Sequence, residues 1–330
     1  MIDAGATARL VSRAAEFLRE GELVAFPTET VYGLGADASN PQAVAKIFAA
    51  KGRPPDHPLI VHLPESSYLA QWAIDIPEAA KQLAAEFWPG PLTLILKRNT
   101  GVPDAVTGGQ DTVGLRVPDH PLALALLREF KGGIAAPSAN RFGHLSPTTA
   151  AHVASELGGA VAMILDGGAC KVGIESTIVD LSCGTPRILR PGMIEATHIA
   201  RVIGDVHDSA INQSAVVPRV SGSLDAHYAP RTPMQMVPAD ELLPAVCAAI
   251  ADGKRLVVLA SISAPESLDE LVWRAASSSS TDFARALYAE LHALDALSCD
   301  LILVQQPPET SPWLAVSDRL RRAVAGSGRI

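Results

Sequence analysis

The sequence has few cysteines, and their spacing suggests neither a zinc site nor a disulfide framework. Both of those features depend on cysteines at short, regular spacings, and no Cys-x-x-Cys pair is present. We therefore expect four reduced thiols in a cytoplasmic protein, and no metal held by the protein's own side chains. The four residues concerned are Cys170, Cys183, Cys247 and Cys299.

Long apolar runs and a surplus of basic residues are also missing. No stretch approaches the about 20 apolar residues of a membrane helix, and no basic segment leads into an apolar run near the N-terminus. The net charge is −8, and residues 1–205 and 206–330 each contribute −4. We expect a soluble protein without membrane contact. Tight, non-specific binding of nucleic acid, which requires many phosphate-neutralising side chains on one face, is disfavoured.

What the sequence does contain is enough apolar material for a large core. Of the 330 residues, 48% are hydrophobic and 19% are charged, and this length favours two domains. In the longer N-terminal part, strands and helices mix without a strict βαβ rhythm, which predicts an α/β fold with a twisted, mixed sheet. The pattern predicts helices at 6–19, 42–50, 78–87, 121–130 and 148–157, and strands at 23–26, 59–63, 92–97, 112–117, 133–136, 162–165, 177–181 and 187–189.

The C-terminal part is predicted to form a separate unit. Proline, glycine and serine punctuate residues 206–233, which we interpret as a linker between domains 1–205 and 234–330. The second domain is predicted to be a small, Rossmann-like α/β unit. Its expected strands are 234–237, 255–260 and 300–304, and its expected helices are 240–251, 282–297 and 313–325.

Three segments carry groups that suit a polyphosphate. They are Pro27-Thr28-Glu29-Thr30-Val31-Tyr32-Gly33-Leu34-Gly35, then Lys51-Gly52-Arg53, then Pro137-Ser138-Ala139-Asn140. Lysine and arginine supply charge for oxyanions, whereas serine and asparagine supply neutral hydrogen bonds that fix orientation. The second and third segments each also have a simpler explanation. The two cations could be solvated at a helix end, and Pro-Ser-Ala-Asn could be an ordinary turn.

Two other nucleotide-binding patterns are disfavoured. Gly33-Leu34-Gly35-Ala36-Asp37-Ala38 has alanine where a dinucleotide fingerprint has its third glycine, and no acidic residue follows at the expected distance. A P-loop is absent from the sequence, so side chains must hold any triphosphate.

Arg116 lies within an apolar strand, where an arginine is costly without an anionic partner.

The sequence resembles the threonylcarbamoyl-AMP synthase family, which has the YrdC-like fold, in its long two-domain form. The resemblance rests on PTETVYGLGAD, AKGRPPDHPLIVH, WPGPLT and APSAN, together with GIEST at 173–177 and HYAP at 227–230. Asp318 stands in a C-terminal segment where the family pattern leads us to expect asparagine. The HYAP segment lies in the linker, so we expect the linker to act as a lid.

The resemblance implies a set of site residues. Lys51, Arg53, Ser138 and Asn140 would be catalytic, with Lys51 near the reacting carbamate. ATP would contact Arg53, His57, Thr112, Ser138, Ser146, Arg190 and Tyr228. L-Threonine would contact Thr30, His62, Arg116, Ser176 and the backbone of Ala136, with its carboxylate on Arg116. Considered alone, His62 fits a core histidine equally well.

The implied reaction joins L-threonine, bicarbonate and ATP into L-threonylcarbamoyl-AMP and pyrophosphate, with magnesium accompanying ATP. The product would serve a complex that transfers the threonylcarbamoyl group to adenosine 37 of tRNA, so any direct tRNA contact should be weak or indirect. Two alternatives remain. One is an RNA-binding translation factor, which the negative charge disfavours. The other is a carbamoyl-adenylate module of hydrogenase maturation, which would need zinc-finger cysteines.

Overall fold

The computed structural model describes residues 4–208, 217–222, 224–268 and 271–329. The chain forms two compact units, Met1–Phe142 with Pro147–Ser223, and Gly143–Ser146 with Leu224–Ile330. The sequence-based division placed boundaries at residues 205 and 233 instead. Linker residues 217–222 group with the first unit and residues 224–233 with the second, while 209–216 and 223 lie outside the described residues.

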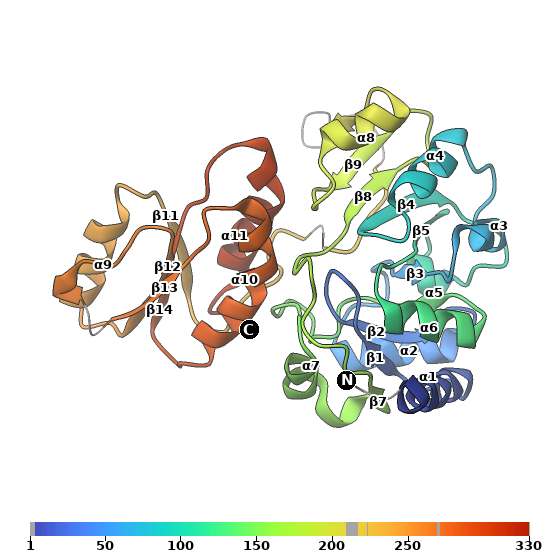
Figure 1. The fold of residues 1–330 in the computed structure, drawn as a ribbon, viewed down its shortest axis with the longest axis horizontal. Helices are drawn as coiled ribbons and strands as arrows, with labels where there is room; N and C mark the ends of the chain where they lie inside the picture. The colour runs from blue at the N-terminus through green and yellow to red at the C-terminus, as the bar shows by residue number, and fades with distance from the viewer. Residues whose placement is uncertain (1–3, 209–216, 223, 269–270, 330) are drawn as a thin grey trace. The chain divides into compact units, whose positions relative to one another are not determined.

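The first unit is built on a mixed sheet, as predicted, with the order β10-β9-β8-β4-β5-β3-β6-β2-β1-β7 (Figure 1). Parallel pairs such as β3–β5 occur in it together with antiparallel pairs such as β4–β5. The strands are β1 Val24–Phe26, β2 Gly33–Asp37, β3 Ile60–His62, β4 Leu92–Lys97, β5 Thr112–Arg116, β6 Ile134–Ala135, β7 Met163–Ile164, β8 Thr177–Asp180, β9 Arg187–Arg190 and β10 His207–Asp208.

Helices cover both faces of this sheet. Val24 and Phe26 of β1 belong to one apolar cluster and Ala25 to another, because successive side chains of a strand point to opposite faces. Helices α1 and α6 supply the cluster around Phe26, and α2 and α4 supply the cluster around Ala25. The helices are α1 Ala4–Arg19, α2 Pro41–Lys51, α3 Leu69–Trp72, α4 Glu78–Phe87, α5 Asp104–Thr107, α6 Pro121–Phe130, α7 Ala150–Leu157 and α8 Ala196–Ile203.

Helix α2 places Lys51 at its last residue. Asn40 caps its N-terminus, because the side chain accepts hydrogen bonds from the backbone N–H groups of Gln42 and Ala43 at 3.0 and 3.2 Å. Pro41 occupies the first turn, where its missing N–H costs nothing. Gly52 ends the helix with a φ of 62°, a left-handed conformation that glycine adopts without strain. The predicted Asn-Pro start and the position of Lys51 are thus confirmed.

The second unit contains a four-stranded, fully parallel sheet of order β11-β14-β12-β13. This agrees with the small Rossmann-like α/β domain expected from the sequence, although β13 was not predicted. Its strands are β11 Met234–Val237, β12 Leu256–Ala260, β13 Val272–Ala275 and β14 Leu301–Gln305. Its helices are α9 Leu242–Ala251, α10 Ser280–Asp295 and α11 Leu314–Gly326.

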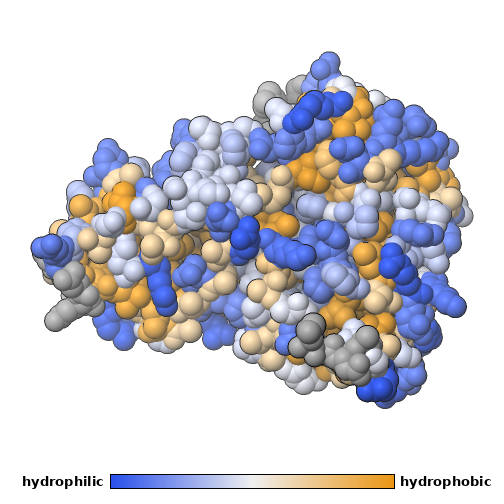
Figure 2. All heavy atoms as spheres, viewed as in Figure 1, coloured by the Kyte–Doolittle hydropathy of each residue, from blue (hydrophilic) through white to orange (hydrophobic). Residues whose placement is uncertain are grey.

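The surface gives no indication of a membrane-spanning segment. Among the described residues, every helix is too short or too polar to cross a bilayer. Large exposed hydrophobic side chains come from separate elements, for example Leu10 of α1, Ile74 after α3 and Leu314 of α11. Figure 2 shows hydrophilic residues interspersed among hydrophobic ones over the face in view.

Candidate active site

Lys51 is buried against the segment Pro137–Asn140. Its Nζ donates hydrogen bonds to the carbonyl oxygens of Ser138 and Asn140 at 2.6 and 2.5 Å, and the residue is 4% exposed. Burial, and then the nearby charge of Arg53, hold the pKa of Lys51 well below its ordinary value. The interpretation of Lys51 as a solvated helix end is therefore wrong.

The segment that carries Ser138 and Asn140 is fixed to the loop before β2. The backbone N–H of Leu34 donates to the carbonyl of Pro137, and that of Ala139 donates to the carbonyl of Tyr32, both at 2.8 Å. An isolated bridge pairs Gly33 with Ser138. The first and third sequence segments singled out above are thus joined through their backbones, and Lys51 from the second contacts the same place.

Two buried arginines meet at one serine of the linker. Arg53 Nη2 donates to the carbonyl of Pro58 at 2.9 Å and to Ser221 Oγ at 3.2 Å. Arg190 Nη1 donates to the carbonyl of Ser221 at 2.8 Å. Arg190 also donates from Nε and Nη2 to the carbonyl and hydroxyl oxygens of Ser176, at 3.0 and 3.1 Å. The predicted site residues Arg53, Arg190 and Ser176 are thereby brought together. The residue that joins them, Ser221, was not predicted.

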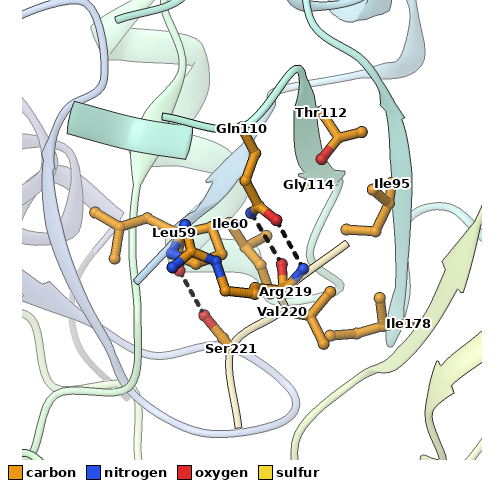
Figure 3. A pocket seen from close by; sticks show the side chains of 11 residues that line it. Leu59, Ile60, Ile95, Gln110, Thr112, Gly114, Ile178, Arg219, Val220 and Ser221 are labelled. Atoms are coloured by element: carbon orange, nitrogen blue, oxygen red, sulfur yellow. Dashed lines mark hydrogen bonds between the residues drawn. The ribbon is translucent and has the colours of Figure 1, made fainter. Parts of the chain in front are cut away.

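We call residues 217–222 the linker strap. Figure 3 shows how its centre lies over the sheet, with Val220 beside Ile95 and Ile178. The amide of Gln110 holds the backbone of Arg219 on both sides, accepting from its N–H at 2.7 Å and donating to its carbonyl at 3.1 Å. Ser221 Oγ donates to the carbonyl of Pro58 at 2.9 Å. The linker strap is therefore held against the rest of the first unit through Arg219 and Ser221.

Arg116 has a carboxylate partner within the chain. Its Nη2 lies 2.6 Å from Glu29 Oε1 and 3.0 Å from Thr30 Oγ1, and its Nε donates to the carbonyl of Gly90 at 3.2 Å. Arg116 and Glu29 are 4% and 3% exposed. The expectation that a buried arginine requires an anion is confirmed. The anion present is Glu29, which sequence reasoning did not single out, although it stands directly before Thr30.

His62 lies beside Arg116, because β3 and β5 pair these two residues directly. Its ring packs edge-on against Phe26 with 5.9 Å between the ring centres. Burial, and then the charge of Arg116, lower the pKa of His62 to about 3, so the ring is neutral at physiological pH. Ala136 joins the same region, since its backbone N–H donates to the carbonyl of Ile60 at 2.9 Å.

The remaining first-unit residues offer side chains with spare hydrogen-bonding capacity. Within the part of the chain that the structure describes, the hydroxyls of Ser138 and Thr112 make no hydrogen bond. His57 is half-buried and packs edge-on against Phe142 at 5.4 Å. Burial, and then the charge of Arg53, lower the pKa of His57. These groups are chemically suited to a polar ligand.

Comparisons with known proteins identify the family of the chain. A family profile described as telomere recombination matches residues 16–192, and the profile of the C-terminal domain of threonylcarbamoyl-AMP synthase matches residues 194–325. A threonylcarbamoyl-AMP synthase from Pyrococcus abyssi is 43% identical over 318 residues, covering 94% of this chain and 92% of its own. That of Bacillus subtilis is 42% identical and covers 96% and 93%. The chain belongs to the threonylcarbamoyl-AMP synthase family.

A solved structure in this family shares the whole fold. The crystal structure of P. abyssi Sua5 complexed with L-threonine has a TM-score of 0.88 at 41% identity, and the match covers 96% of this chain and 94% of that one. Both units of the present chain are therefore built as in a threonylcarbamoyl-AMP synthase of known structure.

Two residues that family resemblance assigned to ATP lie in the second unit of this threonylcarbamoyl-AMP synthase relative. The carbonyl of Ser146 is 3.2 Å from His292 Nε2 of α10. Tyr228 is 1% exposed. The centre of its ring lies 4.1 Å from the ring centre of His227 and 5.5 Å from the guanidinium of Arg319. The HYAP segment is thus a buried part of the second unit.

No metal-binding cluster accompanies these residues. The described part of the chain contains no group of three or more histidine, cysteine, aspartate or glutamate side chains that could hold a metal ion. The charged groups near the Ser138 segment include Glu156, whose carboxylate accepts from the backbone N–H of Arg141 at 3.3 Å.

Proposed function

We propose that this member of the threonylcarbamoyl-AMP synthase family converts L-threonine, bicarbonate and ATP into L-threonylcarbamoyl-AMP. The amine of threonine would attack the carbon of bicarbonate, and loss of water would give a carbamate. A carbamate oxygen would then attack the α-phosphorus of ATP, and the bond to the β-phosphate oxygen would break with release of pyrophosphate. The carbamate is a weak nucleophile, so most of the acceleration must come from positioning and charge neutralisation.

Threonine binding is assigned to the wall formed by Thr30, His62 and Arg116, with Ala136 and Ser176 nearby. The observation that carries this assignment is the state of Arg116. Its Nη1 donates no hydrogen bond to any residue that the structure describes, while its other nitrogens are engaged. The N–H groups of Nη1 on a buried guanidinium suit the charge of a carboxylate. The neutral ring of His62 adds no competing charge beside it.

ATP binding is assigned to the region of Arg53 and Arg190, with His57, Thr112 and Ser138 completing the side-chain contacts. Two guanidinium groups converging on Ser221 are spaced so that one ligand group can reach both. Ser146 and Tyr228 remain candidates for the nucleotide from the second unit. Asn140 is proposed to hold the orientation of the Ser138 segment. Its Nδ2 donates to the carbonyl of Arg141 at 2.9 Å.

Magnesium is proposed to arrive with ATP, held by phosphate oxygens, and to add to the neutralisation of the leaving pyrophosphate. Lys51 is proposed to lie next to the carbamate, since its amine is held within the same segment as Ser138 and Asn140. We further propose that the product is passed, in the cytoplasm, to a complex that modifies adenosine 37 of tRNA. Contact of this chain with tRNA would then be indirect.

Pyrophosphate release by the purified protein tests the proposal. Release should require ATP, L-threonine and bicarbonate together, and it should fall by at least about 100-fold in Lys51→Ala or Arg53→Ala. Lys81→Ala, which changes an exposed lysine of α4, is the matched control and should retain full activity. Release that continues without threonine would contradict the assignment and would indicate a different acceptor.

A further inference from the structure

A chain of hydrogen bonds runs from Glu29 to the backbone of Val31. Glu29 Oε1 accepts from Arg116 Nη2, Arg116 Nη2 also donates to Thr30 Oγ1, and Thr30 Oγ1 lies 2.8 Å from Thr28 Oγ1. Thr28 Oγ1 donates to the carbonyl of Val31 at 2.6 Å. Each of these residues is buried. The donor and the acceptor of each hydrogen bond in this series can therefore be assigned in turn.

The hydroxyl proton of Thr30 is placed by its neighbour. A hydroxyl has one proton to donate, and the proton of Thr28 is used on the carbonyl of Val31. The 2.8 Å contact between the two hydroxyls is then assigned with Thr30 as the donor, and Thr28 Oγ1 also accepts from the backbone N–H groups of Thr30 and Val31, both at 3.2 Å. Arg116 occupies one lone pair of Thr30 Oγ1. What remains on Thr30 is a single acceptor position, so this hydroxyl can receive a hydrogen bond from a ligand but cannot donate one.

The N–H groups of Arg116 can be assigned to their acceptors in the same way. A guanidinium has five N–H groups in a rigid plane. The Nε proton goes to the carbonyl of Gly90, and the two Nη2 protons go to Glu29 and Thr30. The two Nη1 protons meet no acceptor within the described residues. Arg116 therefore presents one donor pair in a plane that its other contacts define.

Glu29 is itself held from three directions. Its Oε2 accepts from the backbone N–H of Asp119 at 3.0 Å, and its backbone carbonyl accepts from Val172 at 2.7 Å. With Oε1 on Arg116, both carboxylate oxygens are held by the protein. Through Oε1, Glu29 fixes Arg116, which in turn contacts Thr30.

We propose that Glu29 is a positioning residue that sets amino-acid specificity. It fixes Arg116, whose Nη1 presents two N–H donors, beside Thr30, whose hydroxyl oxygen presents one acceptor position. This rests on the proposed function, in which that wall receives L-threonine. The matching ligand carries a carboxylate for Arg116 Nη1 and a hydrogen-bond donor for Thr30 Oγ1. A β-hydroxy amino acid has both. L-Valine, which has nearly the same shape as threonine, lacks the hydroxyl donor.

Glu29→Gln tests the proposal with almost no change of shape. An amide has one acceptor oxygen and one donor nitrogen, so one of the two donors, Arg116 Nη2 or the N–H of Asp119, would face another donor. Loss of a hydrogen bond to a charged group should raise the KM for L-threonine about 10- to 100-fold, while the KM for ATP and kcat change by less than about threefold. Glu86→Gln, at an exposed carboxylate of α4, is the matched control.

Thr28→Val provides a second variant that leaves the pair of Glu29 and Arg116 intact. It removes the acceptor for the proton of Thr30, which can then turn toward the ligand, and it also removes the acceptor of the backbone N–H groups of Thr30 and Val31. The preference for L-threonine over L-valine in kcat/KM should fall about 10-fold. This readout is a ratio within one protein, so a uniform loss of folded enzyme does not alter it.

The outcomes separate the two proposals. A folded Glu29→Gln variant whose threonine KM is unchanged, or whose ATP KM rises equally, would overturn the positioning role. If Glu29→Gln does not fold, the Thr28→Val ratio decides, and an unchanged ratio overturns the proposal. Wild-type pyrophosphate release that ignores threonine would instead overturn the proposed function, and with it the specificity assignment.

Discussion

The neutral state of His62 predicts a specific loss of stability in mild acid. Its pKa is lowered from 6.5 to about 3 in the folded protein, because the ring is buried and lies beside Arg116. In the unfolded chain the pKa returns to about 6.5. The stabilising contribution is therefore fully present above pH 6.5, decreases as the pH falls through this window, and is lost below about pH 3.

The size of the effect follows from proton linkage. Each pH unit inside the window costs up to about 1.4 kcal/mol of unfolding free energy. Relative to pH 8, the expected loss from His62 is about 1 kcal/mol at pH 5.5 and about 3 kcal/mol at pH 4.5. His62→Gln removes the titrating group and should remove this part of the pH dependence. The variant will be less stable at neutral pH, but its disadvantage should shrink by those amounts in acid.

Equilibrium urea denaturation at about pH 8, 5.5 and 4.5 measures this difference. The four tryptophans are divided between the units, so replacing Trp273 and Trp313 by phenylalanine leaves Trp72 and Trp88 as reporters of the first unit. His198→Gln, at an exposed position of α8, is the control. If wild type and His62→Gln lose stability in parallel between pH 8 and 4.5, the reasoning about His62 is wrong.

Three further predictions concern the strap and the packing below the site. Gln110→Ala should release the linker strap and speed hydrogen–deuterium exchange at 217–222; unchanged exchange would show that Gln110 does not hold it. Ser221→Ala removes an acceptor that competes for Arg53, so the KM for ATP should fall about 2- to 10-fold, and a rise would contradict the assignment of Arg53 to phosphate. Gly133→Ala would place a methyl group 2.3 Å from the Trp72 ring, so the Tm should fall by at least about 4 °C, whereas Gly184→Ala, which has open space around it, should leave it unchanged.

Elements with strong local signatures could be predicted from the sequence. Helices α4 and α6 and strand β4 begin and end where the hydrophobic pattern placed them, at 78–87, 121–130 and 92–97. Helix α2 has its expected cap at Asn40. In each case the residues that define the element are neighbours along the chain. Local periodicity and capping chemistry were therefore sufficient.

Strand β2 was missed because its sequence does not resemble a strand. Gly33 and Gly35 give it little β propensity, and the segment resembled a nucleotide-binding loop. The structure explains the glycine at 35, where a Cβ would lie 2.8 Å from Phe26 and 2.9 Å from Ile134. The close approach of a neighbouring strand and side chain requires this residue. That requirement comes from residues far away in the sequence, which a local pattern does not contain.

The candidate site was predictable in its residue types but not in its pairings. The structure brings Lys51 to the Ser138 segment, and it brings Arg53 and Arg190 together at Ser221. The partner of Lys51 turned out to be the backbone of Ser138 and Asn140, and the partner of Arg116 turned out to be Glu29. These contacts join positions 87 to 89 residues apart. Only the folded sheet brings them together, so spacing along the chain could not reveal them.

The partners of the three arginines differ in a way that bears on how the site works. Arg116 is paired with a buried carboxylate whose second oxygen and backbone are also bonded, so its position is set before any ligand binds. Arg53 and Arg190 instead share neutral oxygens of Ser221, on a strap held mainly by Gln110. A phosphate carries charge and would be a stronger acceptor than a serine oxygen for either arginine. Under the proposed function, the wall assigned to the amino acid is therefore fixed by a buried ion pair, whereas the contacts of Arg53 and Arg190 with Ser221 are ones that a phosphate can replace.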